Sequence, residues 1–588
     1  MTDPPDIPVP QTALGRLFEQ AALSGEAVAF SLPGGTTLYL GGEAADQLYF
    51  LRNGRLGAFR RADGDERRLL GVIRPGETAG EMALISETRH FGEVVALRDS
   101  EILALPRAAF FEAIARDPAV MIEVARLMAP RARQIAQGVA PEEPNVFGFV
   151  GVTEALKARP LVDQIARAIE AMGHTVAVID GGALGLSTGW FSNVEHSCAF
   201  VLYVAEATEA AWVQFVARQI DRLFHIAPGD RAPPDQGRST DLDATRGATV
   251  FRGRKADLVL VHRATDAAPR GSAAWTQALT PTRLLHVRQG IRADVDRLAR
   301  LLTGRAVGLV LSGGGARAYA HIGAVRALHA RGVPIDFLGG VSMGAIVAAG
   351  VAMGWDDAEL DQRIRKGFVD SSPVDDVSLP LIAMTSGGKV RARLAEHFGD
   401  RDIADLWRPF FCLSSNLTTG VYRLHDRGLV REALAASSAL PGVLPPVIDG
   451  DDVLVDGAVM KNFPVDIMRA LQSGPIVGID VGHGRSVTAH DMERPDSLGR
   501  WFLSGDWRKG PPIISLLIRS ATVTAERDAT AVHEATDVLV LPMVDNIEIR
   551  DWKAYEPAVA AGERATLEAL DKLHGPVTEL RRRTSEEH

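Results

Sequence analysis

The feature that most constrains this 588-residue chain is a glycine-rich stretch from Ala306 to Gly350. It contains two short apolar runs, and each is followed by glycines and then by a segment with helical periodicity. Such strand-to-helix turns are typical of a parallel α/β sheet, whose strands each lead into a covering helix. The second turn, at residues 340–344, has the pattern G-x-S-x-G, which places Ser342 on a sharp turn with its hydroxyl exposed. We therefore expect the rest of the chain to be organised around this serine.

Three consecutive glycines, Gly313, Gly314 and Gly315, end the first apolar run. Successive glycines let backbone N–H groups converge on one point, and the helix that follows adds its positive N-terminal end. Such donors can hold the negative charge that develops on a carbonyl oxygen when a serine attacks it. Arg317, one turn into the helix, would add charge or brace the loop. We predict that these four residues form an oxyanion hole.

A serine hydroxyl also needs a base that takes its proton. Asp456 follows the apolar run 452–455 and precedes a glycine, and partial burial at a strand end can raise the pKa of such a carboxylate. This favours a serine–aspartate pair. A triad of Ser342, Asp456 and His483 has an order that also occurs in α/β hydrolases, so it stays open as an alternative. We expect His483 to be a polar loop residue.

The G-G-G-x-R loop, the G-x-S-x-G turn and the later D-G-A resemble, in this order, the patatin-like phospholipase family, whose members use a serine–aspartate dyad. The strings TGRAVGLVLSGGGARAYAHIGAVRAL, SSNLTTG and ASSALPGVLPPV support the resemblance. It implies that Ser342 is the nucleophile, Asp456 the base, and 313–315 with Arg317 the oxyanion loop. Ala318 departs from the family pattern, which usually has glycine there, and we expect its methyl group to narrow the loop.

Residues 12–135 read mostly as short strands, followed by two helical stretches. Asn53-Gly54 and Asp63-Gly64 are hairpin signals. This part resembles a cyclic-nucleotide-binding domain, a small β-roll. The order of a nucleotide-type roll, an α/β segment and a patatin-like domain resembles the neuropathy target esterase group, which are lysophospholipases.

The phosphate cassette implied by that resemblance begins at Gly80 and Glu81 and ends at an arginine that binds the cyclic phosphate. Here His90 occupies the register of the arginine, and Arg89 stands one place early. Glu93 stands where a small hydroxyl residue is usual. A carboxylate repels a phosphate, and a shifted arginine loses its bidentate geometry. We therefore treat Gly80, Glu81 and Arg89 as a degenerate site and do not expect it to bind a cyclic nucleotide.

Residues 136–145 are polar and read as a linker, and strands alternate with helices from there to residue 304. Apolar runs separated by segments of period 3.6 indicate an α/β layer with a mostly parallel sheet. We expect one helix over 209–224. The predicted fold is multidomain α/β, with a β-roll (12–135), an α/β domain of structural or coupling role (136–304), and a patatin-like α/β hydrolase domain with a helical extension (305–588).

Composition excludes several classes of protein. A net charge of −10 argues against a general nucleic-acid binder. Cys198 and Cys412 lie too far apart for a metal motif and fit a reducing cytoplasm. No basic-then-apolar leader and no apolar run of about 18–20 residues is present in the sequence. We expect a cytoplasmic protein with peripheral contact at the inner membrane face, for which oligomerisation stays open.

Other functions fit the sequence less well. A dinucleotide fingerprint would use Gly313, Gly315 and Ala318, but Asp336 precedes the second strand, where it is badly placed for a ribose. His321 has no further ligands at metal spacing, so we expect neither a metal nor a cofactor. A non-catalytic signalling or scaffold protein is the alternative of another class. The resemblance implies instead an esterase that acts on lysophospholipids or other acyl esters.

Overall fold

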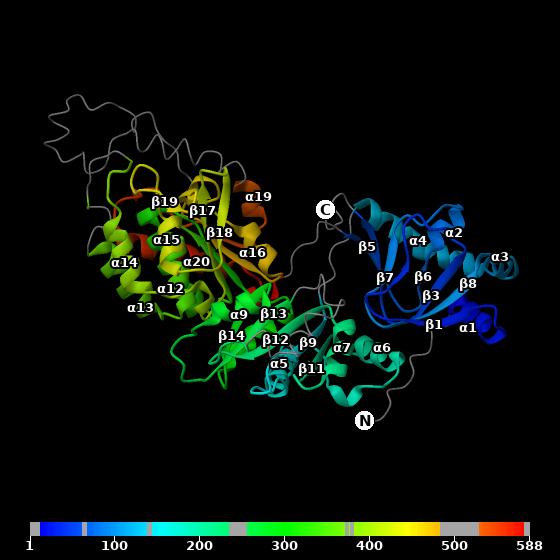
Figure 1. Ribbon diagram of the computed structural model, residues 1–588. Coiled ribbons are helices and arrows are strands. Elements are labelled where there is room, and N and C mark those ends of the chain that lie inside the picture. Colours follow the sequence, from blue (N-terminus) through cyan, green and yellow to red (C-terminus); the bar gives the residue numbers. More distant parts are fainter. Residues whose placement is uncertain are drawn as a thin grey trace. The chain divides into compact units, whose positions relative to one another are not determined.

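The computed structural model describes residues 12–61, 67–137, 144–234, 256–370, 376, 382–482 and 529–580 (Figure 1). Contacts between Cα atoms divide the chain into two compact units. The first holds the described residues up to Ala227, with Pro234, Ala256 and Asp257. The second holds Pro228–Pro233 and the described residues from Leu258 onward. The segment 136–304 therefore contributes to both units.

The first unit begins with a roll of two antiparallel four-stranded sheets, ordered β1-β8-β3-β6 and β2-β7-β4-β5. One buried cluster takes apolar side chains from both sheets, among them Leu51 and Leu56. The helices pack on a second cluster, in which Phe18 stacks on Phe50 with 5.0 Å between ring centroids. The predicted β-roll is confirmed. Its elements are α1 (Ala13–Ser24), β1 (Val28–Leu32), β2 (Thr37–Tyr39), β3 (Gln47–Asn53), β4 (Leu56–Arg61), β5 (Arg67–Ile73), β6 (Thr78–Ala79), α2 (Glu81–Ser86), β7 (Glu93–Ala96), β8 (Ser100–Pro106), α3 (Arg107–Arg116) and α4 (Ala119–Gln137).

One of the two hairpin predictions is wrong. The turn at Asn53-Gly54 joins β3 to β4, but β3 pairs with β6 and β8, whereas β4 pairs with β5 and β7. The turn therefore carries the chain from one sheet to the other. Strands β4 and β5 do pair as antiparallel neighbours, and the second signal, Asp63-Gly64, lies outside the described residues between them.

Four parallel strands follow in the first unit, in the order β10-β11-β9-β12. The predicted parallel arrangement is confirmed for these strands. The helix expected over 209–224 is too long, because it ends at Gln219 and Arg222–Pro228 form strand β12. The other elements are β9 (Val146–Gly151), α5 (Arg159–Ala171), β10 (Val176–Ile179), α6 (Thr188–Ser197), β11 (Phe200–Ala205) and α7 (Ala210–Gln219).

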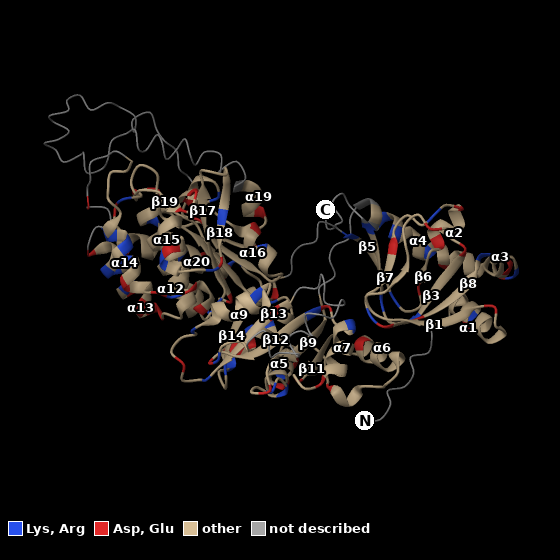
Figure 2. Ribbon diagram, in the orientation of Figure 1, with Lys and Arg blue, Asp and Glu red and all other residues tan. Residues whose placement is uncertain are grey.

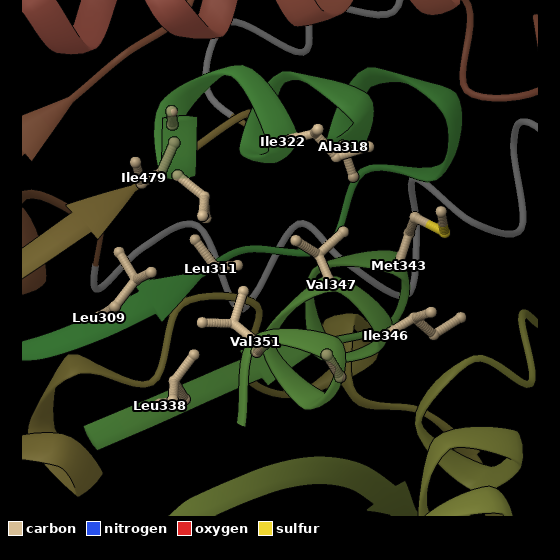
Figure 3. Close-up of a cluster of buried hydrophobic side chains, with 14 of the residues drawn as sticks. Leu309, Leu311, Ala318, Ile322, Leu338, Met343, Ile346, Val347, Val351 and Ile479 are labelled. Carbon is tan, nitrogen blue, oxygen red and sulfur yellow. The ribbon is translucent and has the colours of Figure 1, made fainter. Parts of the chain in front are cut away.

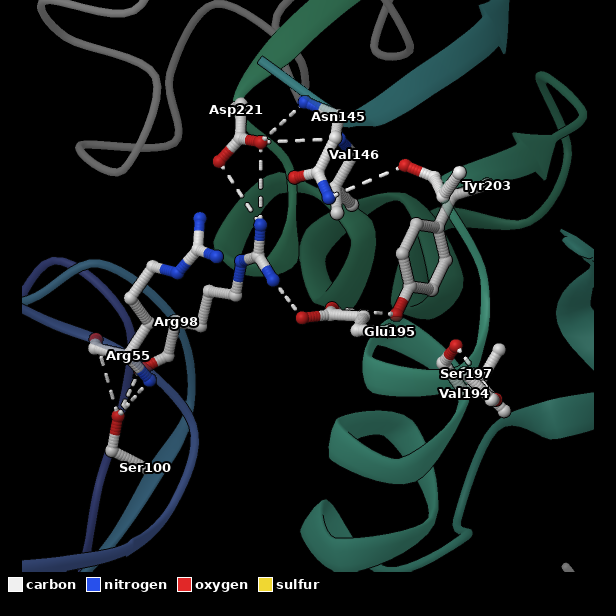
Figure 4. Close-up of polar contacts among 11 residues, drawn as sticks. Arg55, Arg98, Ser100, Asn145, Val146, Val194, Glu195, Ser197, Tyr203 and Asp221 are labelled. Carbon is white, nitrogen blue, oxygen red and sulfur yellow. Dashed lines mark hydrogen bonds and ion pairs between the residues drawn. The ribbon is translucent and has the colours of Figure 1, made fainter. Parts of the chain in front are cut away.

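A buried charge cluster joins the roll to these strands within the first unit (Figure 4). Arg98, between β7 and β8, pairs with Glu195 of α6 and lies 3.1 Å from Asp221. Burial raises the pKa of Asp221, but the charges of Arg98 and Arg55, together with hydrogen bonds from Val146 and Arg98, hold that pKa below its ordinary value. Asp221 also accepts hydrogen bonds from the backbone N–H groups of Asn145 and Val146. Arg98 thus joins the roll to the parallel layer, and a second ion pair, from Arg218 of α7 to Asp99 at 2.9 Å, adds to this contact.

The second unit contains the neighbouring strands β13 and β14 and an eight-stranded sheet with the order β19-β20-β17-β16-β15-β21-β22, in which β18 pairs with β17. Strands β17, β16, β15, β21 and β22 are parallel, and β18, β19 and β20 run antiparallel to their neighbours. The strands are β13 (Ala256–His262), β14 (Arg283–Arg288), β15 (Gly308–Leu311), β16 (Phe337–Val341), β17 (Phe410–Asn416), β18 (Val421–His425), β19 (Val447–Asp449), β20 (Asp452–Asp456), β21 (Ile476–Ile479) and β22 (Val538–Val540).

Helix α12 packs directly against strands β15 and β16, and Figure 3 shows its side chains Val347 and Val351 beside Leu309 and Leu338. All its residues except the last are buried, which explains why its sequence is apolar on every face. The helices of this unit are α9 (Ser272–Leu279), α10 (Arg292–Leu302), α11 (Ala320–Ala330), α12 (Met343–Met353), α13 (Asp357–Ile364), α14 (Gly388–Phe398), α15 (Val430–Ser437), α16 (Val465–Leu471), α19 (Ala529–Glu534) and α20 (Tyr555–Asp571).

Helices α11 and α20 cross at two glycines. A Cβ atom at Gly323 would lie 1.9 Å from the carbonyl oxygen of Val559, and one at Gly562 would lie 1.8 Å from that of Ala320. Only glycine permits this approach of two backbones. The C-terminal helix thereby covers the helix that follows the glycine loop, which confirms the predicted helical extension in the part that the structure describes.

The surface carries both charge signs. Figure 2 shows Lys and Arg interspersed with Asp and Glu over the described elements. Among the residues that the structure describes, no helix combines the length and the apolar character needed to cross a membrane.

Candidate active site

Ser342 lies between the end of β16 and the start of α12, with φ 54° and ψ −128°. A positive φ is strained for a serine, and such strain is typical of functional turns. The glycines on either side allow the turn: a Cβ atom at Gly340 would lie 2.8 Å from the nitrogen of Ala345, and one at Gly344 would lie 2.4 Å from the oxygen of Ser312. The G-x-S-x-G pattern thus forms the sharp elbow that the sequence predicts.

A hydrogen bond to helix α15 holds the backbone of the elbow. The N–H of Ser342 donates to Oγ of Ser437, at 2.9 Å. Ser437 is fully buried, so this hydroxyl is a fixed anchor. Sequence reasoning missed it, because Ser437 lies in an ordinary small-residue helix and only the fold brings it to the elbow.

The three glycines of the loop have different environments. The N–H of Gly313 donates to Oδ1 of Asn462 at 3.0 Å, and Nδ2 of Asn462 donates back to the oxygen of Gly313 at 3.2 Å. Gly314 and Gly315 instead line the pocket that contains Ser342. Their N–H groups donate to no acceptor within the described residues. Two of the predicted oxyanion glycines therefore face the pocket, and Gly313 anchors the loop.

Arg317 braces the loop. Its Nε donates to the carbonyl oxygen of Ile547 at 2.6 Å, and burial lowers its pKa. It is absent from the pocket lining. Of the two roles expected from the sequence, the geometry favours bracing. Ala318, which was expected to narrow the loop, is buried in the core cluster with Ile322 (Figure 3) and is absent from the pocket lining.

Asp456 reaches the elbow through strand pairing. Val341 pairs with Leu413 of β17, and Ser414, the next residue, pairs with Asp456 at the end of β20. The Asp456 side chain is 2% exposed, and Oδ1 accepts a hydrogen bond from the N–H of Ala458 at 2.9 Å. Ser342 and Asp456 line the same pocket. The fold thus brings together the two residues that the sequence singled out.

The remaining lining of this pocket is mainly apolar, as a site for an acyl chain would be. The proline-rich segment 440–446 contributes Leu440, Pro441, Val443 and Leu444, whereas Pro445 and Pro446 are absent from the lining. The other apolar lining residues are Met343, Ile346, Phe368, Val390, Ala458, Val459, Ile549 and Trp552.

No described histidine lines this pocket. Nε2 of His321 lies 2.8 Å from the oxygen of Ser312, and burial lowers the pKa of His321 to about 4. His533 pairs with Asp480 at 3.0 Å. His483, the third member of the alternative triad, lies outside the described residues. Within the described part of the chain, no cluster of His, Cys, Asp and Glu suits a metal ion.

The roll contains a second cavity, of about 460 Å³, lined by Gly80, Glu81 and Arg89 among others. Gly80 has φ 89° and begins helix α2 as predicted. Oε1 of Glu81 accepts a hydrogen bond from Arg131 of α4 at 2.7 Å. Arg89 donates to the oxygen of Gly42 at 2.8 Å. The two charged residues of the predicted cassette thus have partners within the protein.

His90 and Glu93, which depart from the cassette pattern in the sequence, also line that cavity. His90 stacks on Tyr39 with 3.7 Å between ring centroids. Glu93 is 4% exposed and forms an ion pair with Arg67 at 2.6 Å. A buried carboxylate disfavours an anion beside it.

A serine on a strained elbow, a glycine loop and a buried aspartate in an apolar pocket are typical of one class of protein, the hydrolases of lipid esters. The model of patatin-like phospholipases matches residues 309–469, and that of cyclic nucleotide-binding domains matches residues 29–117. The chain is 29% identical over 559 residues to an uncharacterized NTE family protein of Mycobacterium tuberculosis, covering 92% of this chain and 91% of that one.

The likeness extends to animal proteins. The chain is 27% identical to the Drosophila melanogaster neuropathy target esterase sws, over 86% of this chain, and 27% identical to human patatin-like phospholipase domain-containing protein 6, over 90% of this chain. It spans 40% and 43% of the length of these two relatives. The resemblance to the neuropathy target esterase group is confirmed: these matches support a lipid ester hydrolase with a patatin-like domain and an N-terminal cyclic nucleotide-binding-like domain.

Proposed function

We propose that this protein is a lysophospholipase that releases a fatty acid through a dyad of Ser342 and Asp456. The observation that carries the proposal is the pocket itself. It combines the elbow serine, a buried carboxylate and two glycines with free N–H groups in an otherwise mainly apolar lining. Such a site suits a substrate with one long acyl chain and one ester.

In the first half of the reaction, Oγ of Ser342 attacks the ester carbonyl carbon while Asp456 takes the hydroxyl proton. The N–H groups of Gly314 and Gly315 stabilise the oxyanion of the tetrahedral intermediate. The bond to the alcohol then breaks, and the alcohol leaves with the proton from Asp456. Asn462 and Arg317 hold the loop in place during these steps.

In the second half, a water molecule attacks the acyl-serine and gives its proton to Asp456. The acyl–oxygen bond breaks, Ser342 regains the proton, and the fatty acid leaves. The same aspartate thus serves both steps, as microscopic reversibility requires. His483, the third member of the alternative triad, lies outside the described residues, so substitution of this histidine distinguishes the dyad from a triad.

The other parts of the chain have proposed roles as well. The roll (12–135) would regulate or orient the esterase domain (305–588) without binding a cyclic nucleotide, because the charges of its cassette are already paired. The segment 136–304 would couple the two. Contact with the inner face of a membrane would be peripheral.

A fluorophosphonate probe tests the nucleophile directly, because it forms a covalent bond only with an activated serine. We expect the probe to label the native protein at Ser342, and Ser342→Ala to remain unlabelled. Labelling of another residue, or none, contradicts the proposal.

The proposed reaction uses no metal ion. We expect a chelator to leave fatty acid release unchanged, measured with and without excess calcium. Strong inhibition that calcium reverses would contradict this mechanism.

A further inference from the structure

The pocket around Ser342 contains polar groups that the proposed reaction does not use. Nε1 of Trp552 and Oγ of Ser438 are buried and have no hydrogen-bond partner within the described residues. Both residues line the pocket. Proteins leave few buried donors unpaired, and an indole N–H can only donate. These atoms therefore indicate a ligand that brings hydrogen-bond acceptors into the pocket.

Arg550 adds a positive charge to the same lining. It forms no ion pair with any described carboxylate, and burial lowers its pKa although the charge of Glu548 acts in the opposite direction. A half-buried guanidinium that lacks a paired carboxylate favours an anion. Its planar set of donors matches two oxygens of a phosphate.

The segment that carries these residues is fixed against the glycine loop. The N–H of Ala316 donates to the oxygen of Ile549 at 2.9 Å, and Arg317 donates to that of Ile547. A Cβ atom at Gly315 would lie 2.2 Å from the oxygen of Ile549, so the contact requires glycine. Arg550 and Trp552 are thus held beside the loop that is proposed to stabilise the oxyanion.

We propose that Arg550 and Trp552 form a phosphate-binding subsite that recognises the head group of the lipid substrate. This inference rests on the proposed function. The acyl chain would lie against the apolar lining, the ester at Ser342, and the phosphodiester at the guanidinium and the indole N–H. A neutral monoacylglycerol would leave the guanidinium unpaired, so the subsite selects phospholipids among single-chain esters.

The test compares two substrates with the same acyl chain, lysophosphatidylcholine and monoacylglycerol. For the native protein, kcat/KM should be higher for lysophosphatidylcholine. Arg550→Gln should lower the ratio of the two kcat/KM values about tenfold or more, mainly through KM for lysophosphatidylcholine, because a site built to pair a polar group discriminates strongly against its absence. An unchanged ratio would overturn the subsite.

Three further variants separate charge, donor and general effects. Arg550→Lys keeps the charge without the planar fork and should restore part of the ratio. Trp552→Phe keeps the ring that lies against Tyr319 but removes the N–H, and should lower the ratio by less than Arg550→Gln. Arg292→Gln, at an 84% exposed arginine side chain of α10, is the matched control and should leave the ratio as in the native protein.

Soluble competitors identify the source of the phosphate. Glycerophosphocholine should inhibit the native protein competitively, and it should inhibit the Arg550→Gln variant much less. Inorganic phosphate that inhibits equally well would mean a site for free phosphate and would overturn the assignment to a head group.

The outcomes also separate the subsite from the proposed function. Failure of the native protein to hydrolyse either lipid would refute the proposed function, whereas hydrolysis of both with an unchanged ratio in Arg550→Gln refutes the subsite alone.

Discussion

The two pockets of this chain begin in the same way and differ in how their polar groups are paired. In each pocket, one lining segment is a turn with positive φ that begins a helix. This turn residue is Ser342 in one pocket and Gly80 in the other. In the roll, Arg131 donates to Glu81 and Arg89 donates to the oxygen of Gly42. Beside Ser342, the donors of Gly314, Gly315 and Trp552 have no acceptor within the described residues. This difference underlies our proposal that the pocket at Ser342 binds a substrate and that the cavity in the roll does not bind a cyclic nucleotide.

The largest expected effect comes from the base. Asp456→Asn removes the proton acceptor and should lower kcat for ester hydrolysis by about 10³-fold or more, measured as fatty acid release at saturating substrate. His483→Ala should keep most of the activity. Equal losses in both variants would mean that the pocket contains a triad.

A smaller loss of kcat is expected when the hydrogen bonds that hold the glycine loop are removed. Asn462→Ala breaks both hydrogen bonds to Gly313 and should lower kcat about tenfold to a hundredfold with little change in KM, because the loop donors serve the transition state. Asn462→Asp keeps the acceptor for the Gly313 N–H, so its kcat should lie between those of the native protein and the alanine variant. A loss confined to KM would show that Asn462 does not position the oxyanion loop.

The next prediction concerns pH. Burial lowers the pKa of His321 from 6.5 to about 4, so the unfolded chain binds a proton that the folded chain excludes between these values. Neutral His321 therefore makes its full contribution to the free energy of unfolding above pH 6.5. This contribution falls by about 3 kcal/mol as the pH drops toward 4. His321→Gln keeps a donor near the oxygen of Ser312 and cannot gain the proton. Its free energy of unfolding, from denaturant titrations, should depend on pH less steeply; an unchanged slope would contradict the account.

The smallest effect is expected in the roll. Calorimetry with cyclic AMP and cyclic GMP should show no saturable binding tighter than about 1 mM. Glu93 would repel the phosphate, and Glu81 already accepts a hydrogen bond from Arg131. Micromolar binding that Glu81→Ala abolishes would remove the contrast between the two pockets.

The sequence predicted much of this architecture because its signals are local. The elbow, the glycine loop and the cassette at Gly80 each require particular residues at neighbouring positions. The predicted helix over 209–224 is too long because the short apolar run 222–228 fits either a helix or a strand. Only pairing with β9 makes this run strand β12. The Asn53-Gly54 turn failed because local turn chemistry does not specify which sheet the next strand joins.

Parts of the candidate site had no local signal. Ser437 and Asn462 contact the elbow and the loop across 95 and 149 positions of sequence. Arg550 and Trp552 lie beyond the last motif and reach the pocket only because their segment binds the glycine loop. Such residues can be found only once the fold is known.

The most direct test of the central claim is fatty acid release from lysophosphatidylcholine by the native protein and by Ser342→Ala. We predict steady release by the native protein and none above background by the variant, with both showing the same thermal unfolding. Release by the variant, or none by the native protein, would contradict the assignment of Ser342 as the nucleophile of a lysophospholipase.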